Sequence, residues 1–306
     1  MSAARFHETV MDCLSELKSD SHKVQEKALQ TLSFITKASP PNRSLLAQTD
    51  GAISTLIDLS KSLSSIIETL SLSILFNLSL NPDLKRSLAE METIYLLNSI
   101  IQSPSSQESS KLASSLICSL AMLDKNKAKF GAAATIQLLV KSVSKPSGPA
   151  THHLLSSLAE LVHFHGNCTL AVQSGAVSVL LQLVSSTDGE DLAGTSLAIL
   201  NLLARFDVGL NALRGTDQIV SSMVDVLKGR CMFSKEGAAE ILLRLFDESE
   251  GCMRDALRLP DFSTVLDDLQ LRGSVKAREK ASQLMKKMME ANFDTHIDGN
   301  SMFYRW

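Results

Sequence analysis

The sequence predicts an all-α fold made of stacked helical repeats. Two observations predict it: a spacing of 41 to 43 residues between similar segments, and a composition poor in strand-forming residues. A period in this range is typical of helical units that stack into a solenoid. Aromatic residues make up only 5% of the 306 residues, which favours interdigitating helices over strands. The spacing joins the large apolar residues that open each segment, Ile53, Ile94, Ile136, Val177, Ile219 and Phe262.

The second repeat shows the expected order of elements. Residues 42–48 can form a short first helix, because the Asn42 side chain can accept a hydrogen bond from the free amides at its start. Gly51 then provides the left-handed backbone that a sharp turn needs. Ile53 and Leu56 lie on one apolar face of the second helix, because their spacing matches the helical period. After a Ser/Lys stretch, residues 66–80 complete the repeat as a longer third helix.

The same order recurs seven times along the chain, and no Pro/Gly-rich linker interrupts it. The second helices are expected to begin near Val10, Ile53, Ile94, Ile136, Val177, Ile219 and Phe262, and the third helices to cover residues 24–36, 66–80, 108–123, 149–164, 191–206, 234–249 and 274–290.

The two ends of this array are expected to differ from its middle. The first repeat has no room for a short first helix and is therefore truncated. The last helix, 274–290, alternates apolar residues with Lys and Arg, which suits the polar outer face of a capping repeat. We thus expect one repeat domain over residues 1–290 and a flexible C-terminal tail over 291–306. The tail ends in Phe303-Tyr304-Arg305-Trp306, either a frayed terminus or a short docking peptide.

Charge and cysteine content exclude several classes of partner. The formal net charge of -3 provides no field that would draw the chain to nucleic acid or an anionic membrane. The five cysteines are scattered and form no Cys-x-x-Cys pair, which is typical of a reducing compartment. No apolar signal core opens the chain, and no run of 18 apolar residues occurs. We expect a cytoplasmic or nuclear protein without a membrane partner.

Several segments resemble the armadillo (ARM) repeat. Asn42-Arg-x-x-Leu, Asn126-Lys-Ala-Lys-Phe and Gly175-Ala-Val are similar to the Asn-Lys-x-x-Ile and Gly-Ala-Ile signatures of that family. Ile74-Leu-Phe-Asn-Leu and Ile199-Leu-Asn-Leu-Leu resemble its third-helix motif. The resemblance covers residues 6–290 and implies a right-handed α-solenoid of about seven armadillo-type three-helix repeats.

The C-terminal repeats narrow the resemblance. Ser234-Lys-Glu-Gly-Ala-Ala-Glu-Ile-Leu-Leu is similar to a stretch of the armadillo regions in plant U-box ubiquitin ligases, with Gly237 where those proteins usually have Asn. Leu271-Arg-Gly-Ser-Val-Lys-Ala-Arg resembles their ending. Only a handful of residues precede the first expected helix, too few for a U-box. The resemblance therefore implies a chain that binds partners but does not ligate ubiquitin alone.

In the armadillo family the third helices line a concave groove, where one Asn per helix binds the backbone of an extended peptide through its donor and acceptor. The resemblance implies that the groove of this chain is formed by two rows of residues, namely Phe34, Asn77, Ser119, Glu160, Asn201, Arg244 and Lys286, and one turn earlier Gln30, Ser73, Ser115, Ser156, Leu197 and Glu240.

These rows keep only part of the family pattern. Asn77 and Asn201 are the two amides of the ladder, and no Trp stands beside them, which excludes the Trp/Asn arrays of importin-α. The long row of Lys and Arg found in β-catenin is also missing. We expect a Ser-rich groove that is negative near Glu160 and positive toward Arg244 and Lys286. Alternatively, these residues are solvated polar positions without a partner.

The sequence carries little sign of catalysis or metal binding. His152, His153, His163, His165 and Cys168 are residue types that ligate zinc, but eleven residues separate His152 from His163, or roughly 16 Å along one helix. We expect helix-terminal histidines, with His163 and His165 near a helix end at Gly166, and no metal. The chain shows no phosphate loop, HExxH, GxSxG or EF-hand pattern, so no cofactor, small-molecule substrate or enzyme activity is expected.

Three functions remain to be compared. The first is a non-catalytic scaffold or adaptor that binds a partner segment in the groove. The second is the substrate-recognition part of a U-box ubiquitin ligase whose catalytic module lies elsewhere. The third is nucleic-acid binding through the basic helix that contains Lys276, Lys280, Lys286 and Lys287, although the net charge disfavours it.

Overall fold

The computed structural model describes residues 3–145, 148–186 and 189–301 of the chain, with side chains described from His7 to Ala291. Every regular element among these residues is helical, which confirms the all-α prediction. The chain divides after Ser174 into two compact units, Met1–Ser174 and Gly175–Trp306. We call them the N-terminal unit and the C-terminal unit and describe each by itself. The prediction of one continuous repeat domain stays a prediction.

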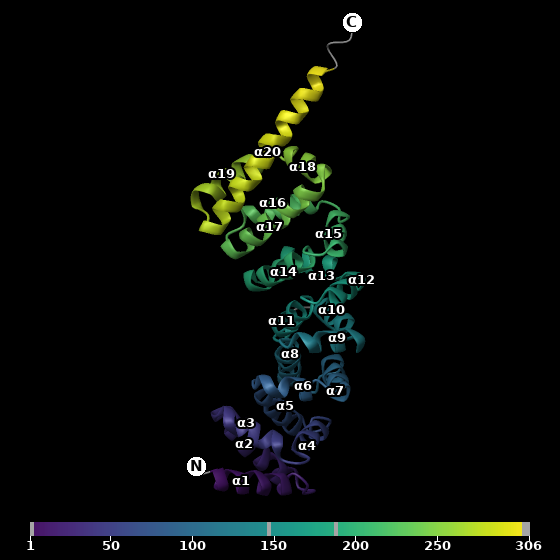
Figure 1. Ribbon diagram of the computed structural model, residues 1–306, viewed down its shortest axis with the longest axis vertical. Helices are drawn as coiled ribbons and strands as arrows, with labels where there is room; N and C mark the ends of the chain where they lie inside the picture. Colours follow the sequence, from purple (N-terminus) through teal and green to yellow (C-terminus); the bar gives the residue numbers. More distant parts are fainter. Residues whose placement is uncertain (1–2, 146–147, 187–188, 302–306) are drawn as a thin grey trace. The chain divides into compact units, whose positions relative to one another are not determined.

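The N-terminal unit follows the predicted order of short, medium and long helices (Figure 1). Its elements are α1 (Ala3–Glu16) and α2 (His22–Ala38); α3 (Pro40–Gln48), α4 (Ala52–Leu59) and α5 (Ser65–Ser79); η1 (Pro82–Leu84), α6 (Lys85–Leu88), α7 (Met91–Gln102) and α8 (Gln107–Ala121); α9 (Asp124–Ala132), α10 (Thr135–Val143) and α11 (Thr151–Leu161); and α12 (His165–Gln173).

The C-terminal unit repeats the same order. Its elements are α13 (Ala176–Ser185) and α14 (Glu190–Leu203); α15 (Asp207–Arg214), α16 (Ile219–Lys228) and α17 (Met232–Glu248); and α18 (Glu250–Leu257), α19 (Phe262–Arg272) and α20 (Val275–Ser301).

The turn before the second helix has a left-handed backbone in several repeats. Gly51 and Gly175 adopt it with φ of 74° and 82°, where glycine meets no steric penalty. Ala134 and Gln218 take the same conformation at the equivalent junctions, both with φ of 58°. Because two non-glycine residues accept this unfavourable geometry, the packing of the flanking helices must impose the turn.

The third helices form the centre of each stack. In the N-terminal unit α5 packs against α2 on one side and α8 on the other, and α8 packs in turn against α11. Leu72, Ile74, Leu75 and Leu78 of α5 are therefore fully buried, although they point in several directions around the helix. Some polar residues of these helices, such as Ser71 and Ser114, are buried as well, and the remaining side of each helix is open. That side is the predicted binding surface.

The C-terminal end differs from the prediction. Helix α20 continues to Ser301, whereas the sequence analysis ended the last helix at residue 290. The residues after 290 include no proline, so nothing in the chain forces the helix to stop there. Residues 302–306, with the aromatic motif, lie outside the described residues. Within the described part no single helix is long and apolar enough to cross a membrane, and two bent helix pairs reach that length and apolarity only when each pair is taken together.

Candidate protein-binding surface on the third helices

The structure places the predicted groove residues of the N-terminal unit on four helices that pack in chain order. We call this side of α2, α5, α8 and α11 the third-helix face. The Phe34 side chain is 75% exposed there, whereas Asn77 and Ser119 are buried. The eight residues are Gln30 and Phe34 on α2, Ser73 and Asn77 on α5, Ser115 and Ser119 on α8, and Ser156 and Glu160 on α11.

The two ladder amides are already hydrogen-bonded within the chain. Asn77 Nδ2 donates to Thr36 Oγ1 at 3.1 Å and to the Ser33 carbonyl at 3.4 Å. In the C-terminal unit, Asn201 Nδ2 donates to the carbonyls of Leu197 at 3.1 Å and Gly237 at 3.0 Å. Both NH₂ groups thus link neighbouring third helices. Binding a partner backbone through them would require these bonds to break.

Gly237 explains why Asn201 reaches the next helix. A Cβ at this position would lie 3.2 Å from Leu197 Cβ and 3.4 Å from Asn201 Nδ2. Glycine therefore leaves its carbonyl open to the amide. Leu197 itself is only 1% exposed, yet it lines a cleft of about 670 Å³ in the C-terminal unit, so its place in a binding surface stays a prediction. Its helix is held in the stack on both sides, by α13 and α17.

The charges predicted for the C-terminal unit are largely compensated. Arg244 pairs with Glu240 at 2.9 Å, and Lys280 pairs with the same carboxylate. Burial raises the pKa of Glu240, but Lys280 and Arg244 outweigh burial and hold this pKa below its ordinary value. Exposed Lys286 contacts Glu290 at 3.9 Å. The expected positive character near Arg244 is therefore reduced by Glu240.

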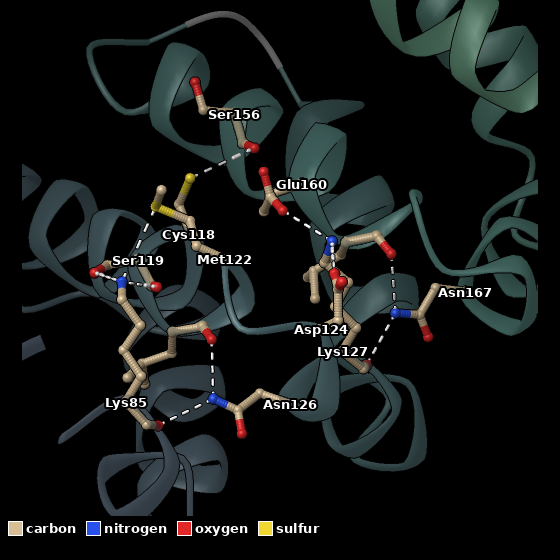
Figure 2. Close-up of polar contacts among 12 residues, drawn as sticks. Lys85, Cys118, Ser119, Met122, Asp124, Asn126, Lys127, Ser156, Glu160 and Asn167 are labelled. Atoms are coloured by element: carbon tan, nitrogen blue, oxygen red, sulfur yellow. Dashed lines mark hydrogen bonds and ion pairs between the residues drawn. The ribbon is translucent and has the colours of Figure 1, made fainter. Parts of the chain in front are cut away.

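Glu160 also forms an ion pair within the chain, in this case with Lys127 of α9, the first helix of its repeat. Lys127 of α9 is 6% exposed, and its Nζ lies 2.9 Å from Glu160 and 2.8 Å from Asp124 (Figure 2). Burial alone would lower the pKa of Lys127, but the hydrogen bonds to Asp124 and Glu160 outweigh it and raise this pKa. This counter-ion reduces the negative charge predicted near Glu160, although Lys127, Asp124 and Glu160 together still carry a net negative charge.

The Asn-Lys signature explains how Lys127 is positioned. Asn126 Nδ2 donates to the carbonyls of Leu120 at 2.9 Å and Lys85 at 3.0 Å, so it caps the end of α8 and ties it to α6. The next residue, Lys127, then extends to α11, the third helix of its own repeat. Asn167 repeats the capping role on Leu161 at 3.1 Å. These asparagines stabilise helix ends and are not partner-binding groups.

Lys85 occupies the equivalent position one repeat earlier, 42 residues before Lys127, and the sequence analysis did not single it out. Its Nζ donates to the Ser119 carbonyl at 2.5 Å and to Ser119 Oγ at 3.0 Å, and lies 4.0 Å from Met122 Sδ (Figure 2). Lys85 is 9% exposed and, among the described residues, pairs with no carboxylate. Burial lowers its pKa, and the more distant charges of Cys118 and Glu160 only partly offset this.

A cleft of about 270 Å³ opens on the third-helix face beside Lys85. Met122 and Leu80 are its most exposed apolar side chains. His153 Nδ1 lies 3.0 Å from Ser115 Oγ within the lining. In the C-terminal unit a cleft of about 670 Å³ is lined by Leu197 but not by Asn201 or Arg244, and one of about 400 Å³ contains no predicted groove residue. The lining residues of the 270 Å³ cleft are Phe76, Leu80, Ser115, Cys118, Ser119, Met122, His153 and Ser156.

The histidine region is arranged differently from the prediction. Helix α11 ends at Leu161, and His165 begins α12, so Gly166 lies inside a helix and not at its end. His165 is therefore at a helix start. Within the described residues no group of three or more His, Cys, Asp or Glu side chains could hold a metal ion. Burial raises the pKa of Cys168 to about 11, which makes this thiol a poor nucleophile.

Sequence comparisons place these repeats among plant proteins. A family model described as the plant U-box protein ARM repeat region matches residues 9–303. U-box domain-containing protein 1 of Medicago truncatula is 31% identical over 116 residues, which are 38% of this chain and 17% of that protein. U-box domain-containing protein 8 of Arabidopsis thaliana is 26% identical over 212 residues, 69% of this chain and 55% of that protein. The chain thus spans only part of the length of these relatives.

Solved structures share the fold at low sequence identity. An engineered protein has a TM-score of 0.77 and 18% identity over 93% of this chain and 68% of its own. A designed armadillo repeat protein has a TM-score of 0.60 and 17% identity over 92% of this chain and 99% of its own. A chain from a structure of the interaction between cadherin and β-catenin has a TM-score of 0.77 and 13% identity, over 97% of this chain and 56% of its own. With an α-solenoid fold and a family match over nearly its whole length, the chain belongs to the family of plant U-box protein ARM repeat regions.

Proposed function

We propose that this chain is a protein-interaction scaffold and that the third-helix face of the N-terminal unit binds a segment of a partner protein. The observation that carries the proposal is the cleft of about 270 Å³ on this face, with Leu80 and Met122 exposed at it. Large exposed apolar side chains beside a cleft are typical of binding surfaces. Phe34 adds a third such side chain on α2, the helix that packs against α5.

The structural relatives support the class of ligand. One set of solved structures consists of armadillo repeat proteins designed for modular peptide recognition. Another shows β-catenin in its interaction with cadherin. These properties belong to those proteins, and we extend to this chain only the class, a protein or peptide segment. No cofactor or small-molecule substrate enters the proposal, and we propose no catalytic step for these repeats.

The binding mode differs from the ladder expected from the sequence. Because the NH₂ groups of Asn77 and Asn201 are engaged within the chain, the affinity would come from side-chain contacts in the cleft and not from the two amides. The partner segment would lie across α5, α8 and α11.

An unbiased selection of linear peptides on the purified chain tests this proposal. Peptides selected on the wild type are measured again on Ser156→Tyr, which places a bulky ring at an exposed residue of the cleft. The matched control is Ser99→Tyr, at an exposed serine of the second helix α7. We expect about a tenfold loss of affinity for Ser156→Tyr and no change for Ser99→Tyr. Equal affinity for both variants, or no peptide selected, contradicts the proposal.

A second candidate function follows from the family match. The relatives are U-box domain-containing proteins, so we propose as an alternative that the repeats recognise substrates for ubiquitination. A ubiquitination assay distinguishes the two. The chain alone should give no product, and copurification of a U-box or RING protein that restores product favours the ligase role. Copurified partners without any ubiquitin transfer favour the scaffold role alone.

A further inference from the structure

Lys85 is a buried cation for which the described residues supply no counter-ion. Its Nζ contacts one hydroxyl and one carbonyl, both from Ser119, and the thioether of Met122. A buried ammonium is stable only when hydrogen bonds and an opposite charge compensate for its lost hydration. Here the hydrogen bonds are present, but no carboxylate of the described residues pairs with Lys85, and the more distant charges of Cys118 and Glu160 offset its burial only in part.

The next repeat shows what compensates for such a lysine. Lys127 stands 42 residues after Lys85, at the same position of its first helix, and its Nζ lies 2.9 Å from Glu160. Glu160 is the ladder residue of its repeat, and the ladder residue of the preceding repeat is Ser119. A serine at this position supplies no carboxylate to the lysine, and its hydroxyl also hydrogen-bonds with Ser79, whose carbonyl accepts from it at 3.1 Å.

The Lys85 amine lies directly behind the lining of a surface cleft. Ser119 and Met122, the two residues that Lys85 Nζ contacts, both line the cleft on the third-helix face. Figure 2 shows the Lys85 amine directed toward Ser119 and the Met122 sulfur. Met122 is 65% exposed and unbranched, so it can move aside at little cost. The cleft lining contains no acidic residue, and nearby Glu160 is paired with Lys127.

We propose that an Asp or Glu side chain of the bound partner segment enters this cleft and pairs with Lys85, taking the place that Glu160 fills in the next repeat. The inference rests on the proposed function, because it specifies what the third-helix face binds. The occupant is a single carboxylate: its size and charge match those of the internal pair of Lys127. A phosphate group carries more charge and more acceptor oxygens than one lysine can satisfy.

Two peptide libraries test the inference on the full chain. Both have amidated C-termini and the same randomised positions, but one has a fixed central Glu and the other a fixed central Gln. Amidation removes the terminal carboxylate, so a preference for the first library reports a side chain. A third library with central phosphoserine is tested beside them. Retained peptides are quantified by mass spectrometry.

Three variants locate the preference. Lys85→Met removes the cation, and Ser119→Glu supplies an internal carboxylate that should occupy it. Lys125→Met removes an exposed lysine of α9 and controls for net charge. We expect the wild type and Lys125→Met to retain the Glu library about tenfold better than the Gln library. For Lys85→Met and Ser119→Glu the ratio should fall to about one.

Several outcomes overturn the inference. Equal retention of the Glu and Gln libraries by the wild type removes it, as does a preference that survives in Ser119→Glu. Better retention of phosphoserine than of Glu, lost in the same variants, replaces the carboxylate by a phosphate. If the Gln library binds equally well and Ser156→Tyr blocks it, the third-helix face binds a segment without acidic preference. In that case the proposed function stands and this inference fails.

Discussion

Two neighbouring repeats of the N-terminal unit solve the same structural problem differently. In both, a lysine from the first helix extends to the ladder position of its own third helix. In the repeat formed by α9, α10 and α11, Lys127 pairs there with Glu160 at 2.9 Å. In the repeat formed by η1, α6, α7 and α8, Lys85 finds Ser119 instead. The fold is the same, but one lysine is neutralised within the chain and the other is not.

The difference separates structural lysines from binding lysines. A lysine whose charge is satisfied internally contributes to the stability of the repeat and offers little to a partner. A lysine left without a counter-ion costs stability, and a ligand that supplies the missing charge recovers this cost on binding. The two lysines differ in this respect because the ladder residue is Glu160 in one repeat and Ser119 in the other.

The largest expected effect is the loss of stability on removing Lys127. Lys127→Met leaves Glu160 without its partner, and this side chain is only 28% exposed. Breaking a fully buried pair costs about 3–5 kcal/mol, and the partial exposure of Glu160 reduces this to about 2 kcal/mol. Denaturant unfolding measures the change. The matched variant Lys125→Met, at an exposed lysine of the same helix, should stay within about 0.5 kcal/mol of the wild type.

A smaller effect of opposite sign is expected when the missing carboxylate is supplied. Ser119→Glu gives Lys85 the counter-ion that Lys127 has, and should raise the free energy of unfolding by about 1 kcal/mol. The gain should vanish in the double variant Lys85→Met/Ser119→Glu, because the new carboxylate then has no cation. A gain that persists in the double variant would mean that the introduced side chain packs well without pairing, and the comparison of the two lysines would lose its basis.

The repeat pattern was predictable from sequence because its signals are local. The apolar residues at i, i+3 and i+4, the turn at Gly51 and the capping Asn126 act within one or two helices. Their positions therefore predicted the helices to within a few residues. The end of α20 was the exception, because its last turns carry no apolar pattern and no proline.

The state of each ladder residue could not be predicted in the same manner, because it depends on the neighbouring helix. Asn77 is engaged by Thr36, 41 residues earlier, and Leu197 is buried by the packing of α14. The unpaired state of Lys85 could have been predicted by comparing two repeats of the sequence, which the sequence analysis did not do. Aligning Lys85 with Lys127 and Ser119 with Glu160 shows that one repeat has the cation without the anion. Only the structure shows that these side chains meet.

The smallest expected effect is the dependence of stability on pH, and here the two lysines should differ in sign. The pKa of Lys85 is lowered below its ordinary value of 10.5 by burial, so between these two values the unfolded chain binds more protons than the folded chain. Stability relative to Lys85→Met should therefore rise with pH up to about 10.5.

The pKa of Lys127 is raised, because its hydrogen bonds to Asp124 and Glu160 outweigh burial. Its contribution, measured against Lys127→Met, should be complete below 10.5 and fall as the pH rises through the folded pKa. Denaturant unfolding of the three proteins over a series of pH values measures both slopes. Slopes of the same sign would show that Lys85 is compensated in solution and would remove the contrast between the two repeats.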